Sequence, residues 1–198
     1  MKKRVLAAVC ICFLLMMLAG CGGAGVPDTV ETTTICIDKK GGVIYYLAGA
    51  FDREYYQLEE LTSMAEKEAA EFCESAGASA VKVEKVELVP EGGDKVVITY
   101  RFDGCEAFEG FNNSGLFYGT VGEAKDAGYA VDVVLTNEKG EELPLNADMD
   151  RRVIITDAKA LVYCPSKATG VSVGAALKED GSVDTIAAEG TVIILLKK

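Results

Sequence analysis

The sequence predicts an α+β fold, in which mostly antiparallel sheets accompany one long amphipathic helix near the N-terminal end of the mature domain. Three observations lead to this class. One segment has a clear helical period, many short runs have strand composition and are joined by turn residues, and the strands do not alternate regularly with helices as they do in parallel-sheet proteins. A chain of 198 residues is long enough to bury the core of one such domain.

The first 20 residues have the layout of an export signal. MKKR is cationic, VLAAVCICFLLMML is apolar without interruption, and small residues precede Cys21. As a helix at about 1.5 Å per residue, the apolar run of about 14 residues spans roughly 21 Å, short of the roughly 30 Å hydrocarbon core of a bilayer. These dimensions favour a signal segment that is removed over a permanent membrane span.

The end of this segment, Leu18-Ala19-Gly20-Cys21, resembles the lipobox of bacterial lipoproteins. In that class the cysteine sulfur receives a diacylglyceryl group and the chain is cut just before the cysteine. The resemblance implies lipidation at Cys21 and a place on the extracytoplasmic face of the cell membrane, held by two acyl chains where one would bind only reversibly. The alternative is an ordinary signal peptide cut elsewhere, which would leave a soluble secreted protein.

The predicted organisation is a signal peptide over 1–20, a flexible tether over 21–34 and a single domain over 35–198. The tether follows from a segment rich in Gly, Thr and small residues that has no apolar period.

The domain is expected to begin with two hairpins separated by the helix. TTICID and GVIYYLAG flank the turn at 39–42, while VKVEKVELV and DKVVITYRF flank the turn at 90–93. Gly77 is placed to cap the helix between them. Its apolar residues recur on one side at Leu58, Leu61, Ala65, Ala69, Phe72 and Ala76.

Shorter elements are expected beyond the second hairpin. The pattern predicts a short helix or turn in CEAFEGFNN, a strand in GLFYGT, a helix in VGEAKDAG, and strands in YAVDVVLT, RRVIITD, ALVYC, GVSVGA and TVIILLK. Because the VIILL run is unbroken, it predicts a strand buried on both faces.

Two stretches, FDREYYQLEELTSMAEKEAAEF and FNNSGLFYGTVGEAKDAGY, resemble uncharacterised lipoproteins of Gram-positive bacteria. No activity is known for that group, so the resemblance implies no functional residues.

The charge and the missing histidine exclude several function classes. The formal net charge is −11, and Lys and Arg gather only in the first four residues and in isolated pairs. Such a surface lacks the basic patch that nucleic-acid binding needs, and it also disfavours adhesion of the folded body to anionic lipids. Without histidine, Ser-His-Asp and Cys-His catalysis and imidazole-based zinc sites are excluded. We therefore expect no enzyme, no cofactor and no metal site.

Four cysteines follow Cys21 in the predicted mature chain, and none forms a CxxC motif. An even number in an exported protein permits two disulfides in three connectivities. However, Cys36 and Cys164 lie in strand patterns and Cys73 lies on the apolar side of the helix, which favours buried free thiols.

Aromatic residues occur in pairs along the domain. Because adjacent strand residues point to opposite faces, one of Tyr45 and Tyr46 is expected to be buried and the other exposed. Tyr45, Tyr56, Phe111 and Asn112 are candidates for a ligand surface, with ordinary core packing as the alternative.

The predicted function is a non-catalytic binding or interaction module of the cell envelope. Its expected contacts are the membrane, through the anchor at Cys21, and an envelope protein or glycan. A structural or assembly subunit of an envelope complex is the second hypothesis. A transporter-associated solute-binding protein is the third, although the predicted mature chain is short for the two-lobed cleft that such receptors use.

Overall fold

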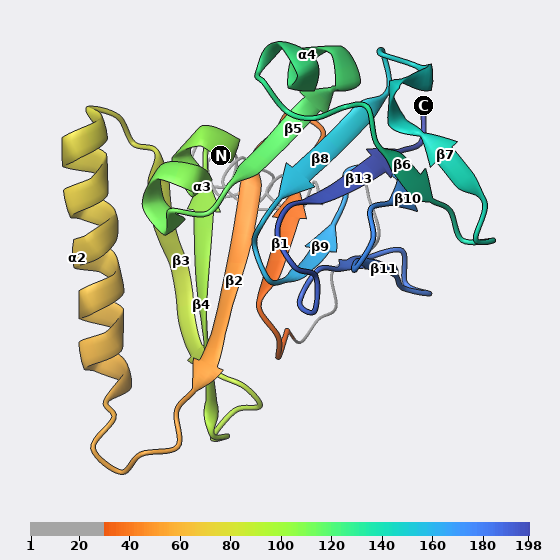
Figure 1. Ribbon diagram of the computed structural model, residues 1–198. Coiled ribbons are helices and arrows are strands. Elements are labelled where there is room, and N and C mark those ends of the chain that lie inside the picture. The colour runs from red at the N-terminus through yellow and green to blue at the C-terminus, as the bar shows by residue number, and fades with distance from the viewer. Residues whose placement is uncertain (1–29) are drawn as a thin grey trace, which may run out of the picture.

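The computed structural model describes residues 30–198, so the predicted signal peptide and Cys21 lie outside the described residues. This part of the chain is an α+β domain with two mostly antiparallel sheets and three α-helices (Figure 1). The helices are α2 (Leu58–Ala76), α3 (Cys105–Asn112) and α4 (Val121–Asp126), with a 3₁₀ turn at Leu145–Ala147.

The larger sheet has the strand order β11-β12-β9-β1-β2-β4-β3. All of its neighbouring strands run antiparallel except β1 and β9, which are parallel. Its strands are β1 (Thr34–Ile37), β2 (Val43–Ala50), β3 (Val81–Leu88), β4 (Lys95–Phe102), β9 (Leu161–Tyr163), β11 (Ala176–Leu177) and β12 (Val183–Asp184).

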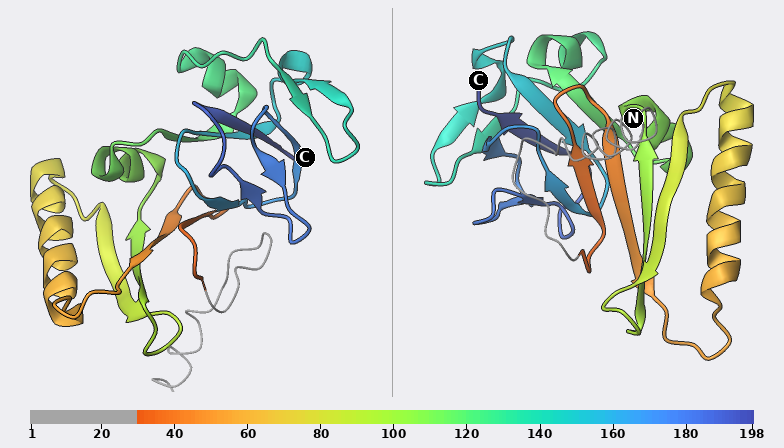
Figure 2. Two further views of the ribbon diagram at one scale, coloured as in Figure 1. Left: turned by 60° about the horizontal axis from the view of Figure 1, so that its bottom comes forward. Right: turned by 180° about the vertical axis from the view of Figure 1, so that it is seen from behind.

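The smaller sheet is antiparallel throughout and has the order β5-β8-β13-β10-β6-β7. Its strands are β5 (Leu116–Thr120), β6 (Val134–Thr136), β7 (Glu142–Pro144), β8 (Arg152–Thr156), β10 (Ala168–Val171) and β13 (Val192–Leu196). The two sheets lie beside each other, with α2 against the β3 end of the larger sheet and the C-terminus in the smaller one, as the view from behind in Figure 2 also shows.

Both predicted hairpins are confirmed. β1 pairs with β2 around a turn in which the Asp38 carboxylate accepts hydrogen bonds from the backbone N–H groups of Lys40 and Gly42, at 2.7 and 3.0 Å. β3 pairs with β4, with a register shift between Val83 and Lys85. Between the hairpins, α2 ends at Gly77, whose φ of 67° is the left-handed conformation that glycine adopts most easily.

Strand β13 is the buried strand that the VIILL run predicts. All five of its residues are buried, and it lies between β8 and β10 in the middle of its sheet. Ile194 belongs to the core between the two sheets, whereas Ile193 and Leu195 belong to a second core on the other face, together with Val121 and Ala124 of α4. The unbroken apolar pattern thus reflects burial on both faces.

Three sequence predictions need correction. The strand predicted over 129–136 is reduced to Val134–Thr136, because Val131 and Val133 contribute to the second core from a loop and need no ladder pairing to be buried. The strand predicted over GVSVGA ends at Val171 and gives way to a turn, where Gly174 has a φ of 90°. Tyr45 and Tyr46 are both partly buried, so neither is the exposed member of the pair.

Candidate functional site

The four residues predicted as a ligand surface separate into two places. Tyr45 and Phe111 belong to a cluster of rings beneath α2 and α3. The Tyr45 ring lies 5.2 Å from Phe108, and the Phe111 ring lies 5.2 Å from Tyr100 and 5.4 Å from Phe72. Burial raises the pKa of the Tyr45 phenol. These rings pack within the domain as core and rim.

Asn112, the third predicted residue, lies at the end of α3. Its side-chain N–H donates to the backbone carbonyl of Phe108 at 2.9 Å, one turn earlier. The next residue, Asn113, has a φ of 49°, which is the left-handed conformation at which helices commonly end. In this position the Asn112 amide serves the helix end and does not lie beside Tyr56.

Tyr56, the fourth predicted residue, lies at the opposite end of the larger sheet, in the segment that joins β2 to α2. Its ring is 5.2 Å from Phe51 and 5.0 Å from Tyr55. These three rings form one side of a groove of about 350 Å³, which we call the aromatic groove. The groove is lined by Ala50, Phe51, Tyr55, Tyr56, Gln57, Glu60, Leu61, Met64 and Val96.

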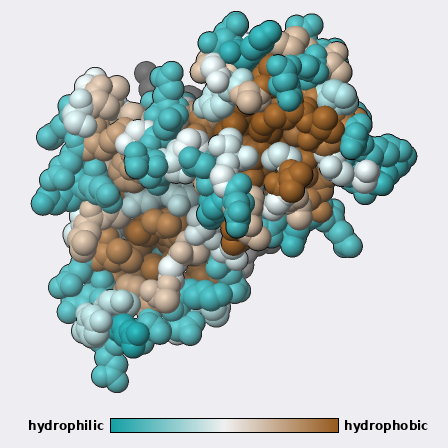
Figure 3. All heavy atoms as spheres, in the orientation of Figure 1, coloured by the Kyte–Doolittle hydropathy of each residue, from teal (hydrophilic) through white to brown (hydrophobic). Residues whose placement is uncertain are grey.

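The aromatic groove is rich in exposed apolar side chains. Tyr55 is 73% exposed, Met64 68% and Tyr56 41%, so large apolar groups here face solvent without cover from the described residues. Leu47, 37% exposed, lies on the same face of the sheet as Val96, because its partner across β4 is Ile98 and strand residues alternate. Figure 3 shows apolar surface beside α2, over the larger sheet, bordered by hydrophilic side chains; a second apolar area lies over the smaller sheet.

The wall that α2 contributes to this groove carries one carboxylate among apolar side chains, and further glutamates follow along the helix. α2 contains six glutamates and one lysine. Glu60 lines the groove directly. Glu68 lies two turns further along the same side of the helix, and its charge contributes, after burial, to raising the pKa of Tyr100 to about 12. The groove therefore joins an apolar floor to a negatively charged edge.

The described chain begins at this same end of the domain. The Glu31 carboxylate pairs with the Lys95 ammonium at 3.3 Å, and Lys95 lies opposite Ala50, which lines the groove. The backbone N–H of Ala48 donates to the Thr33 hydroxyl at 3.3 Å. The last residues of the predicted tether thus run along the end of β2.

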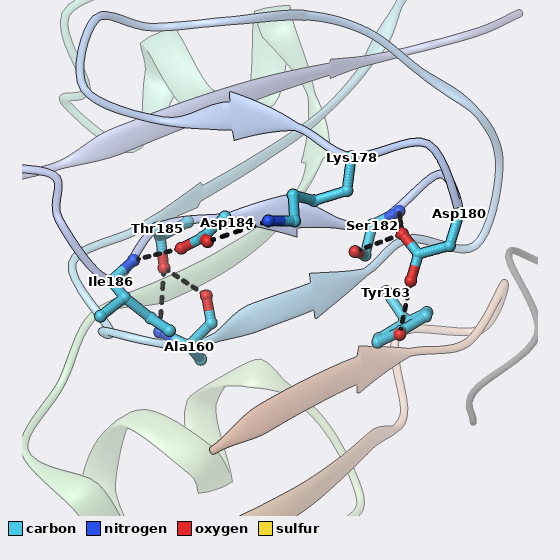
Figure 4. Close-up of polar contacts among 8 residues, drawn as sticks. All are labelled: Ala160, Tyr163, Lys178, Asp180, Ser182, Asp184, Thr185 and Ile186. Carbon is cyan, nitrogen blue, oxygen red and sulfur yellow. Dashed lines mark hydrogen bonds and ion pairs between the residues drawn. The ribbon is translucent and has the colours of Figure 1, made fainter. Parts of the chain in front are cut away.

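A polar network in the β11–β12 region offers a second candidate (Figure 4). The Asp180 carboxylate accepts hydrogen bonds from the Tyr163 hydroxyl at 2.9 Å and from the Ser182 hydroxyl at 2.6 Å. Hydrogen bonds from Ser182 lower the pKa of Asp180, whereas burial and Asp180 raise the pKa of Tyr163 to about 12. Because these groups satisfy one another and Tyr163 holds its proton firmly, the network clamps the β11–β12 turn onto β9.

A wider hollow of about 680 Å³ lies between α3 and β5 and contains Cys105. Burial, followed by the charge of Glu109, raises the pKa of the Cys105 thiol to about 11, so it is protonated at neutral pH. Cys73 and Cys164 are free thiols as well; Cys164 is buried as the favoured prediction has it, whereas Cys73 and Cys105 are only partly buried. In residues 30–198 no group of three or more Cys, Asp or Glu side chains is arranged to hold a metal ion, and no helix is long and apolar enough to cross a membrane.

Sequence reasoning singled out Tyr56 but missed Phe51 and Met64. Phe51 was hidden in the charged stretch FDREYYQ, and Met64 falls beside the apolar stripe of α2. The sequence signal that could have identified Met64 is its position one turn after Glu60, at the edge of the apolar stripe of α2.

No family model, curated protein or solved structure matches this chain.

Proposed function

We propose that the protein is a lipid-anchored, non-catalytic binding module of the cell envelope, which holds a segment of another envelope protein in the aromatic groove. The observation that carries this proposal is the exposure of Tyr55, Tyr56 and Met64 around one hollow. Exposed apolar patches of this kind mark interaction surfaces more often than isolated apolar residues do. Tyr and Met also suit recognition, since Tyr offers a rigid ring with a polar tip and Met adapts its shape.

The proposed location at the membrane rests on Cys21 and on the predicted tether. The lipobox-like sequence supplies the anchor, and the place where the chain enters the fold supports a groove close to the membrane. From Cys21 to Glu31 the chain advances ten residues, which can reach at most about 35 Å when fully extended. A partner within this distance of the bilayer, such as a membrane protein, could be reached without any displacement of the anchor.

In this proposal α2 acts as the long amphipathic helix that the sequence predicts. Ala65 and Ala69 are its buried residues and Leu61 also packs against the core. Met64 and Glu60 lie at the edge of the apolar side of α2 and line the groove. One side of the helix therefore packs in the core, and the adjoining side would contact the partner. A polypeptide fits this surface better than a glycan, because Leu61 and Met64 present flexible aliphatic surface beside the rings.

The anchor is tested by metabolic labelling with palmitate in the native host type. We expect labelling of the wild-type chain and its loss in Cys21→Ala, with processing of the wild type blocked by globomycin. Labelling of the Cys21→Ala variant would contradict lipidation at that position.

The groove is tested by a photo-crosslinking amino acid placed in the full chain at Tyr55 or at Met64, with Val173 as the control. Val173 is apolar and 90% exposed but lies outside the groove, so it measures non-specific contact. We expect both groove positions to crosslink to one and the same envelope protein, identified by mass spectrometry, and Val173 not to do so. Adducts with glycan only, or identical adducts from all three positions, would overturn the proposal.

An assembly subunit of an envelope complex is the remaining alternative that this surface supports. Such a subunit would use the same groove, but its partner would stay bound permanently. A complex that survives purification at fixed stoichiometry would favour this alternative, whereas reversible, saturable binding would favour a binding module.

A further inference from the structure

We propose that the segment held in the aromatic groove is a cationic amphipathic helix, whose apolar stripe packs on the groove floor and whose Lys or Arg side chains meet the acidic edge of α2. This inference rests on the proposed function and adds the chemistry of the partner. It is carried by the position of the acidic side chains relative to the exposed apolar ones.

The side of α2 that lines the groove with Glu60 and Met64 continues one turn beyond the groove to Glu68. Glu60, Met64 and Glu68 are spaced by four residues, which places them on one side of the helix about one turn apart. At about 1.5 Å per residue, the positions of Glu60 and Glu68 lie roughly 12 Å apart along the axis with Met64 between them. Neither carboxylate has an ion-pair partner among the described residues.

The charge at the C-terminal end of α2 is unfavourable for the helix itself, whereas Glu59 and Glu60 in its first turn suit the helix dipole. Its last turn contains no basic residue, although Glu74 lies there beside the negative end of the helix dipole. Its one lysine, Lys67, pairs with Glu71 at 3.6 Å and leaves the other glutamates without a cation on this helix. A cationic partner along this edge would offset a repulsion that the domain alone leaves in place.

A bilayer surface is a poorer occupant for the same reason. Around the rings, Asp52 pairs with Arg53 at 3.5 Å, so Glu54, Glu59 and Glu60 leave this end of the domain negatively charged. Anionic headgroups would be repelled by these carboxylates, whereas a basic polypeptide would be attracted to them.

A helix fits the spacing. Cationic residues seven or eight positions apart on a helix would match the roughly 12 Å between the two carboxylates, and apolar residues between them would face Met64 and the rings. This arrangement is the helix-in-groove mode of recognition, in which anchors recur every three or four residues.

The experiment uses the lipidated full-length product in nanodiscs of zwitterionic lipid, with empty nanodiscs as the blank. The probe is a 16-residue amphipathic peptide of Leu and Lys. Two further probes replace every Lys with Glu, or keep the composition but scramble the order so that the apolar stripe is lost. We expect saturable binding of the first probe only, weakening as salt rises because the rim charges are solvated.

Two variants of equal charge separate the proposed edge from the rest of α2. Glu60→Gln with Glu68→Gln removes the edge charges, and we expect binding about tenfold weaker, which corresponds to about 0.7 kcal/mol for each of two rim ion pairs and lies within the range for surface pairs. Glu66→Gln with Glu74→Gln makes the same change in net charge on the outward side of the helix, and we expect less than a twofold effect.

Each outcome has a definite meaning. Equal weakening by both double variants would overturn the proposal in favour of general attraction to an acidic protein. Equal binding of the Lys and Glu probes would overturn the cationic partner while leaving the groove itself as a binding surface. Failure of every peptide, combined with specific crosslinks from Tyr55 and Met64, would reject the inference and retain the proposed function.

Discussion

Truncation of Phe111 to alanine tests whether this ring packs in the core or belongs to a ligand surface. The two roles predict different changes in the stability of the domain. The Phe111 ring contacts Phe72 of α2 and two rings of β4, Tyr100 and Phe102, at 5.2 to 5.5 Å between centroids. It is therefore the point at which α3, α2 and the larger sheet meet. Removing it leaves a cavity between three elements that cannot close without moving one of them.

The expected cost follows from these contacts. Truncation of a buried Phe to Ala costs about 3–5 kcal/mol, and since Phe111 is partly buried we expect the lower end, about 3 kcal/mol. For a domain of this size, such a loss lowers the melting temperature by roughly 6–12 °C. The matched variant is Tyr55→Ala, whose ring is 73% exposed and whose removal should change stability by less than about 0.5 kcal/mol.

The assay is thermal and urea unfolding of both variants beside the wild type, followed by far-ultraviolet circular dichroism. We expect the Phe111→Ala midpoint to fall by about 1–2 M urea and the Tyr55→Ala midpoint to stay within error. An unchanged midpoint for Phe111→Ala would refute the placement of this ring in the core and return it to the candidate ligand surface.

Three further predictions concern the Cys105 thiol, the Asp180 network and the length of the proposed tether. Because its pKa is about 11, alkylation of Cys105 in the native protein should accelerate about tenfold per pH unit from pH 7 to 10, which peptide mapping can follow; a plateau below pH 9 would contradict the burial of this thiol. Asp180→Asn should destabilise the chain by about 1 kcal/mol, since Tyr163 and Ser182 lose a charged acceptor. The Asp180 pKa is lowered in the fold, so this difference should be full above about pH 4 and should vanish as the pH falls through the lowered pKa, as unfolding at a series of pH values will show. Inserting a 20-residue Gly-Ser segment after Cys21 should weaken binding of a membrane-tethered cationic probe about fivefold, since effective concentration falls with about the 3/2 power of tether length.

The elements that local sequence determines were the ones that sequence reasoning could predict. The turn at Asp38 to Gly42 and the alternation on either side specify the β1–β2 hairpin without reference to the rest of the chain. The unbroken apolar run of β13 likewise reports burial on both faces. Local signals, however, contain no information on which distant strands meet, so the parallel pairing of β1 with β9 was not foreseen.

The candidate site was harder to predict for the same physical reason. The residue type alone does not tell whether an aromatic ring is buried or exposed. Only tertiary packing places Phe111 among three rings and leaves Tyr55 in solvent. Tyr56 was predicted as part of a ligand surface with Tyr45, Phe111 and Asn112, but its neighbours in the groove come from β2, β4 and α2. The convergence of these segments depends on long-range strand pairing.

The proposed anchor and the proposed groove constrain each other through distance and charge. Under the proposal of a flexible tether, the ten residues from Cys21 to Glu31 would have a root-mean-square reach of about 17 Å, which would keep the end of the domain bearing Tyr55 and Tyr56 close to the bilayer. Exposed rings at that distance would tend to enter the lipid interface. The carboxylates of Glu54, Glu59 and Glu60 would oppose this by repelling anionic headgroups, and would so leave the groove open for the proposed basic segment. In this proposal the acidity at this end of the domain favours binding of a cationic helix in the groove over insertion of the exposed rings into the membrane.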